Sequence, residues 1–104
     1  MSLYAVIRGR GPAWDASRPM REQDGWAEHA VFMDALADEG FVVIGGPRGP
    51  DRTFLLIVTA AAEDTVRERL AQDPWSASGQ LRVDSVEPWR ILLGEDRLAR
   101  LTMS

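Results

Sequence analysis

Two segments with helical spacing alternate with four short strand-like segments in this chain, and their order most strongly limits its fold. The helical segments are residues 24–40 and 60–72. The strand-like segments, rich in β-branched and aromatic residues, are residues 3–8, 41–45, 53–58 and 81–87. The order β-α-β-β-α-β predicts an α+β, ferredoxin-like fold with two helices on one face of a four-stranded antiparallel sheet. We expect residues 1–104 to form a single domain, with residues 94–104 as a C-terminal tail.

The opposite face of the predicted sheet needs a cover. The strand-like segments 41–44 and 53–58 are too apolar for a face in contact with water. We therefore expect a homodimer in which two sheets pack face to face. The connection over residues 75–80 is polar and is expected to lack regular structure.

Composition excludes several classes of partner and chemistry. The formal net charge of −4 disfavours nucleic acid, and no apolar run approaches the length of a membrane span. The chain has no cysteine, which removes disulfides and thiol nucleophiles. No secretion signal is recognised at the first residues, so a cytoplasmic location is expected.

The only histidine lies on the apolar face of the first predicted helix. At helical spacing His29 shares a stripe with Trp26, Met33 and Leu36, while Glu28 lies on the other side. Because imidazole titrates near neutral pH, His29 is the obvious candidate for proton transfer.

The predicted topology brings Asp73 to the same end of the sheet as His29. The first helix begins at the end where the second helix finishes, and Asp73-Pro74 terminates the second helix. A carboxylate there would fix the imidazole tautomer and leave the other ring nitrogen free to exchange a proton. Alternatively, His29 is a partly buried residue bonded to a backbone carbonyl, and Asp73 only forms a turn. A single histidine with scattered carboxylates does not predict a metal site.

The chain resembles the YciI-related (YCII) family of the dimeric α/β barrel superfamily from its first strand to Trp89. The resemblance rests on the helix with an inward histidine, on Gly45-Gly46-Pro47, on Asp73-Pro74-Trp75 and on Pro88-Trp89. It implies that His29 and Asp73 are the active-site pair and that no cofactor is needed. The implied activity is that of a cofactor-independent lyase, isomerase or dehydrochlorinase.

The resemblance and the composition of the pocket together suggest a small cyclic or aromatic ligand. Tryptophans suit stacking on a planar ring, and an arginine suits an enolate or phenolate. Many family members carry arginine three residues before the histidine, where this chain has Trp26, so Arg8 or Arg21 is expected to replace it. The candidate substrate contacts are Trp26, Trp75, Arg8, Arg21, Met33 and Gly46.

Other interpretations remain open at this point. The tryptophans could be core or dimer contacts, and Gly45-Gly46 could form a β-bulge. The long connection over residues 9–23 could close the pocket or cover a sheet edge. The protein could also be a dimer that binds a small ligand without turnover, a purely structural dimer or a cofactor-free monooxygenase.

Overall fold

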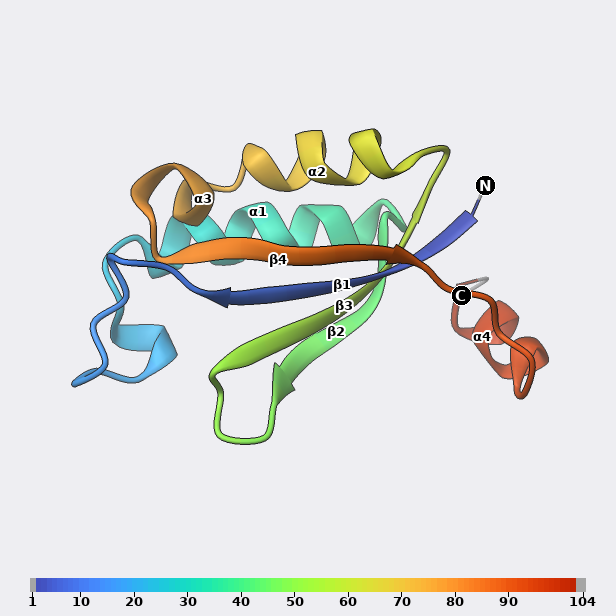
Figure 1. The fold of residues 1–104 in the computed structure, drawn as a ribbon, viewed down its shortest axis with the longest axis horizontal. Coiled ribbons are helices and arrows are strands. Elements are labelled where there is room, and N and C mark those ends of the chain that lie inside the picture. Colours follow the sequence, from blue (N-terminus) through green and yellow to red (C-terminus); the bar gives the residue numbers. More distant parts are fainter. Residues whose placement is uncertain (1, 103–104) are drawn as a thin grey trace.

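A computed structural model describes residues 2–102 and confirms the α+β, ferredoxin-like architecture. Its sheet is antiparallel with strand order β2-β3-β1-β4 (Figure 1). The strands are β1 (Ser2–Arg10), β2 (Val42–Arg48), β3 (Thr53–Ala60) and β4 (Leu81–Pro88). Pro88, which has no N–H to donate to a neighbouring strand, is the last residue of β4, an edge strand.

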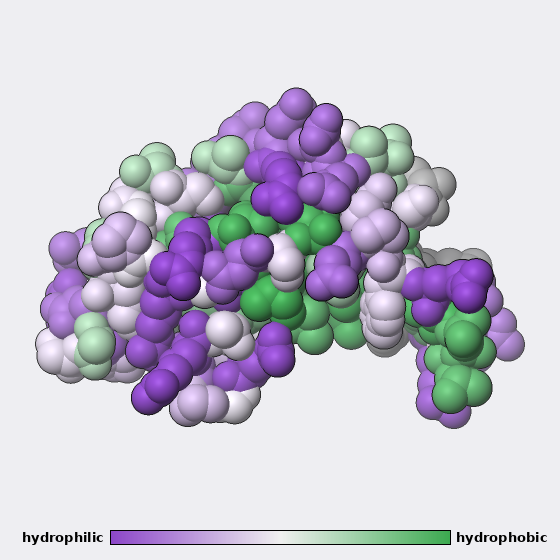
Figure 2. All heavy atoms as spheres, viewed as in Figure 1, coloured by the Kyte–Doolittle hydropathy of each residue, from purple (hydrophilic) through white to green (hydrophobic). Residues whose placement is uncertain are grey.

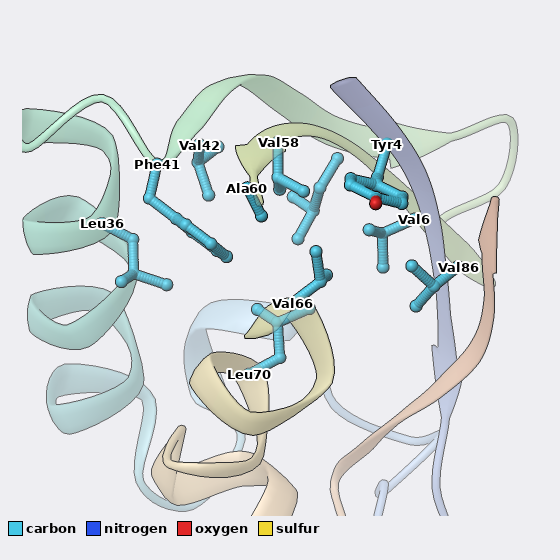
Figure 3. Packing of buried hydrophobic residues seen from close by; sticks show 11 residues of the cluster. Tyr4, Val6, Leu36, Phe41, Val42, Val58, Ala60, Val66, Leu70 and Val86 are labelled. Carbon is cyan, nitrogen blue, oxygen red and sulfur yellow. The ribbon is translucent and has the colours of Figure 1, made fainter. Parts of the chain in front are cut away.

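Three helices lie on one face of the sheet. They are α1 (Trp26–Asp38), α2 (Glu63–Ala71) and the short α3 (Pro74–Ser78), drawn above the strands in Figure 1. The face beneath them supplies the core, where inward residues of β1 and β3 meet α2 (Figure 3). Val6, Val58, Val66 and Leu70 are fully buried there. Packing in this layer fixes where the N-terminus of α1 lies relative to the end of α2.

The prediction that residues 75–80 form a connection without regular structure was wrong, because residues 75–78 belong to the helix α3. Pro74 occupies the first turn, where its missing N–H costs nothing. The side chain of Asp73 caps this helix by accepting a hydrogen bond from the Trp75 N–H at 2.9 Å. Asp73 therefore follows Gln72, the C-cap residue of α2, and begins α3. A second correction concerns the first helical segment, predicted over residues 24–40: α1 begins only after Gly25, the N-cap residue, whose φ is 78°.

The long connection between β1 and α1 folds back over one end of the sheet. It contains a 3₁₀ turn, η1 (Met20–Glu22), and starts beside the end of α3. The Gly11 N–H donates to the Gln80 carbonyl at 2.8 Å, and a β-carbon at Gly11 would lie 2.1 Å from the Gly79 oxygen. Only glycine permits this close approach. Farther along, Trp14 packs in a second apolar cluster with Phe54 and Trp75.

The face of the sheet away from the helices is apolar along β1. Tyr4 and Val6 of β1 point toward the helices, so the alternating residues Leu3, Ala5 and Ile7 lie on the opposite face. No helix within residues 2–102 is long and apolar enough to cross a membrane.

The segment after β4 extends this apolar surface. Residues 89–94 lead to α4 (Glu95–Thr102), which protrudes from the body of the molecule (Figure 1). The protruding part of the molecule shows a hydrophobic patch in Figure 2. Leu92 and Leu93 are 77% and 90% exposed. Two shallow grooves of about 910 and 500 Å³ run along this segment, away from His29.

The packing under α2 predicts the effect of one core substitution. Leu70→Ala should lower the free energy of unfolding by about 2–5 kcal/mol, because a fully buried side chain leaves a cavity. Val31→Ala, at a position 71% exposed on α1, should change it by less than about 0.5 kcal/mol. Urea unfolding followed by circular dichroism measures both, and equal effects would contradict the described core.

Candidate active site

The imidazole of His29 and the carboxylate of Asp73 lie in direct contact, although 44 positions separate them in the chain. His29 lies in the first turn of α1, with its N–H bonded to the Gly25 carbonyl at 3.0 Å. The Nδ1 atom lies 2.9 Å from Oδ1 and 2.8 Å from Oδ2 of Asp73. Asp73 is fully buried and His29 is 7% exposed. An ionised carboxylate can only accept hydrogen bonds, so Nδ1 must be the donor. The single N–H proton of a neutral imidazole therefore lies on Nδ1.

A buried arginine holds the same carboxylate. Arg8 of β1 donates from Nη1 to Asp73 Oδ2 at 2.7 Å. Burial alone would raise the pKa of Asp73, but the hydrogen bonds from His29, Arg8 and the Trp75 N–H outweigh it and hold this pKa below its ordinary value. Asp73 is therefore an anion at neutral pH.

The guanidinium of Arg8 is itself fixed. Its Nη2 donates to the Ser76 hydroxyl at 2.9 Å, and that hydroxyl donates to the Leu70 carbonyl at 2.7 Å. Its Nη1 also lies 4.0 Å from the sulfur of Met33. The residue is 1% exposed, and its Nε has no hydrogen-bond partner within the described chain. This side chain therefore links β1 to the junction of α2 and α3.

One face of the imidazole is covered by Trp75. The two rings stack with centroids 3.9 Å apart and planes 10° from parallel. Trp75 is held in turn by a 2.7 Å hydrogen bond from its Nε1 to the Asp24 carbonyl. Contact with Asp73 and this stack together fix the orientation of the ring, because rotation would break one or the other.

A cavity of about 240 Å³ lies beside the imidazole. Its wall is formed by α1, η1 and the inward faces of the strands. The lining residues are Arg8, Met20, Trp26, His29, Met33, Gly45, Gly46, Pro47, Phe54, Leu56 and Leu81. With Nδ1 engaged by Asp73, Nε2 is the ring nitrogen left for a ligand. No group of three or more side chains able to hold a metal ion occurs in the described part of the chain.

Comparison with protein families identifies the chain. The sequence model of the YCII-related domain matches residues 3–90. The chain belongs to the YCII family. Its match ends before α4, so the protruding C-terminal segment lies outside the family domain. No curated protein matches this sequence significantly.

The fold of this YCII protein is similar to that of a solved enzyme structure. It is 5-chloro-2-hydroxyhydroquinone dehydrochlorinase from Burkholderia phenoliruptrix AC1100, in complex with 2,5-dihydroxybenzoquinone. The two chains are 23% identical and superpose with a TM-score of 0.59, covering 90% of this chain and 97% of the other. At this identity the likeness shows a shared fold alone.

The structure brings most of the predicted site residues of this YCII protein together. Those that border the cavity are Arg8, Trp26, His29, Met33 and Gly46. Trp75 lies behind the imidazole instead of lining the cavity, and Arg21 lies over Trp26 with its guanidinium carbon 5.9 Å from the ring. At Gly46 only backbone can contact a ligand, and a β-carbon there would meet nothing within 4 Å.

Sequence reasoning missed other residues of the site. Met20 and Phe54 line the cavity, and Ser76 anchors Arg8. Met20 lies in the long connection and Ser76 in a helix that was not predicted, so no periodic pattern in the sequence pointed to either residue. The inward position of Arg8, two residues after Val6 in β1, was the available signal that its charge needs a buried partner.

The lowered pKa of Asp73 predicts how its contribution to stability depends on pH. The ionised form stabilises the fold above about pH 4 and loses this effect as pH falls through the lower folded-state pKa. Asp73→Asn should cost about 3–5 kcal/mol at pH 7, because it leaves Arg8 without a counter-charge. The difference from wild type should shrink on acidification below about pH 4 in urea unfolding.

The exposed Asp34 of α1 provides the control for this measurement. Asp34→Asn should change the free energy of unfolding by less than about 0.5 kcal/mol at every pH. A cost for Asp73→Asn that stays constant between neutral and strongly acid pH would contradict the ionised state of Asp73.

Proposed function

We propose that this protein is a cofactor-independent enzyme of lyase or isomerase type, with His29 as general acid/base and Asp73 as its positioning partner. Its substrate would be a small cyclic or aromatic, hydroxylated molecule bound in the cavity beside the imidazole. The proposal rests above all on one observation: a histidine that borders a cavity has Nδ1 within 2.8 Å of a buried carboxylate. A cytoplasmic location is part of the proposal, in keeping with a chain without cysteine.

The dyad can move a proton in two directions. Nε2 takes a proton from a C–H or O–H of the substrate, and the imidazolium that forms is stabilised by the Asp73 carboxylate. The electron pair left on the substrate then shifts within the molecule. In an isomerisation Nε2 returns the proton to another atom, whereas in an elimination the electron pair expels an anionic leaving group.

The structural relative supports this proposed chemistry. The structural relative is a dehydrochlorinase, and it was solved with a hydroxylated quinone bound. The cavity of this chain has aromatic and thioether side chains, including Trp26, Met33 and Phe54, which suit a planar ring. A non-catalytic ligand-binding protein would have the same cavity, so the test must measure proton transfer.

Hydrogen exchange into a ring tests proton transfer without knowledge of the natural substrate. In D₂O the wild-type protein should accelerate exchange of the ring C–H of 2,5-dihydroxybenzoquinone, followed by proton NMR. His29→Gln should lose about 10²–10⁴-fold of this enhancement, because glutamine cannot take up a proton. Binding of the quinone without faster exchange would contradict the enzymatic role.

The control for this experiment is an arginine that lies close to the site but does not border it. Arg21→Gln removes an exposed guanidinium near Trp26 and should leave the exchange rate within about threefold of wild type. An enhancement unchanged in His29→Gln would show that another group transfers the proton.

We also propose that a second copy of this chain covers the apolar face of the sheet. This face carries Leu3, Ala5 and Ile7 of β1, and Ile44 at its edge is 48% exposed. An apolar face left in contact with water is unfavourable, whereas two such faces packed together are both covered.

Sedimentation analysis tests the dimer. Wild-type protein should sediment as a dimer, and Ile44→Asp should shift it to monomer, since a carboxylate buried between two sheets has no counter-charge. Val31→Asp, at an exposed apolar position on α1, should remain dimeric. A monomeric wild-type protein at micromolar concentration would contradict the proposal.

A further inference from the structure

The charge of Arg8 is committed to Asp73 and is not available to a ligand. Its Nη1 and Nη2 donate to Asp73 and Ser76, and the whole residue is 1% exposed. The unpaired Nε has almost no accessible surface either. A ligand anion could reach this guanidinium only by displacing the carboxylate that orients His29.

No other cation borders the cavity in the described chain. Besides Arg8 and His29, its lining consists of apolar side chains and the backbone of two glycines. Arg21 is exposed and lies over the Trp26 ring, outside this lining. The charged groups that face His29 are Asp73 directly and Arg8 through it, and their charges cancel. The resting site with a neutral imidazole is therefore electrically neutral.

We propose that this cavity takes its ligand in the uncharged, protonated form, and takes an anion only together with one proton that is bound by His29. This inference deepens the proposed function, because it defines the charge of the substrate at the same site. Arg8 is then a positioning residue that holds Asp73 ionised, and it does not clamp the substrate.

The proton balance follows from this neutrality. An uncharged ring acid donates its O–H to Nε2, and transfer of that proton gives an imidazolium and a ligand anion with no change in total charge. An anion that arrives already ionised meets a low-dielectric, neutral wall, where an unpaired charge is costly. It becomes paired only when Nε2 takes a proton from solvent, so binding consumes one proton from the buffer.

Two matched ring compounds test the proposal by calorimetry. 4-Nitrobenzamide is uncharged, and 4-nitrobenzenesulfonate is a permanent anion of similar shape. Titrations in two buffers with different ionisation enthalpies, at a pH where free imidazole is mostly neutral, give the protons bound per ligand. The amide should bind without proton uptake, and the sulfonate should bind with uptake of about one proton and about tenfold more weakly for each unit of rising pH.

His29→Gln separates the two possible anion receptors. It should weaken sulfonate binding by about tenfold or more while changing amide binding by less than about threefold, since only the protonatable group is lost. If Arg8 were the anion clamp, sulfonate would bind to this variant as it does to wild type, without proton uptake, and the proposal would be overturned. Arg21→Gln should bind both compounds as wild type does.

Failure of this inference is distinguishable from failure of the proposed function. Anion binding without proton uptake overturns only the charge rule, which is the inference that an anion binds only together with one proton on His29. Binding of the quinone without hydrogen exchange overturns only the enzymatic role. A wild-type protein that binds neither nitro compound at millimolar concentration also contradicts the charge rule, because an uncharged ring should enter the cavity.

Discussion

The buried carboxylate of Asp73 is the point at which three parts of this fold are joined. It accepts a hydrogen bond from Arg8 of β1, contacts the imidazole of His29 in α1, and caps α3 by accepting a hydrogen bond from the Trp75 N–H. Each contact offsets part of the free-energy cost of removing the carboxylate charge from water. Loss of one partner leaves a buried charge that is no longer fully compensated. The same carboxylate therefore supports the fold and orients the histidine.

Around this carboxylate, aromatic packing fixes the shape of the site. Trp75 stacks on His29, Trp26 lies at the cavity wall, and Trp14 from the long connection packs edge-on against Trp75. Rigid rings held on several elements keep the imidazole in one orientation and limit access of water to it. The long connection thus supports the histidine from behind through Trp14 and borders the cavity through Met20.

The proposed chemistry depends on how charge is distributed in this site. Pairing of Arg8 with Asp73 leaves His29 as the one group beside the cavity that changes charge during a proton transfer. A neutral resting site favours creation of an imidazolium and a substrate anion side by side, because each stabilises the other in a cavity of low dielectric. The substrate is therefore expected to supply the proton that His29 accepts.

The fold class follows from the sequence alone, because the periodicity of its segments and their order leave one arrangement of helices on the sheet. Topology then placed His29 and Asp73 at the same end, and their contact agrees with that prediction. The side-chain contacts around the site depend on how distant segments pack, and local sequence patterns do not encode them. Asp73 proved to begin α3, and Arg8 and Trp75 proved to hold the carboxylate and the imidazole. Those partners come from distant segments, and only packing selects which buried charge or ring meets which.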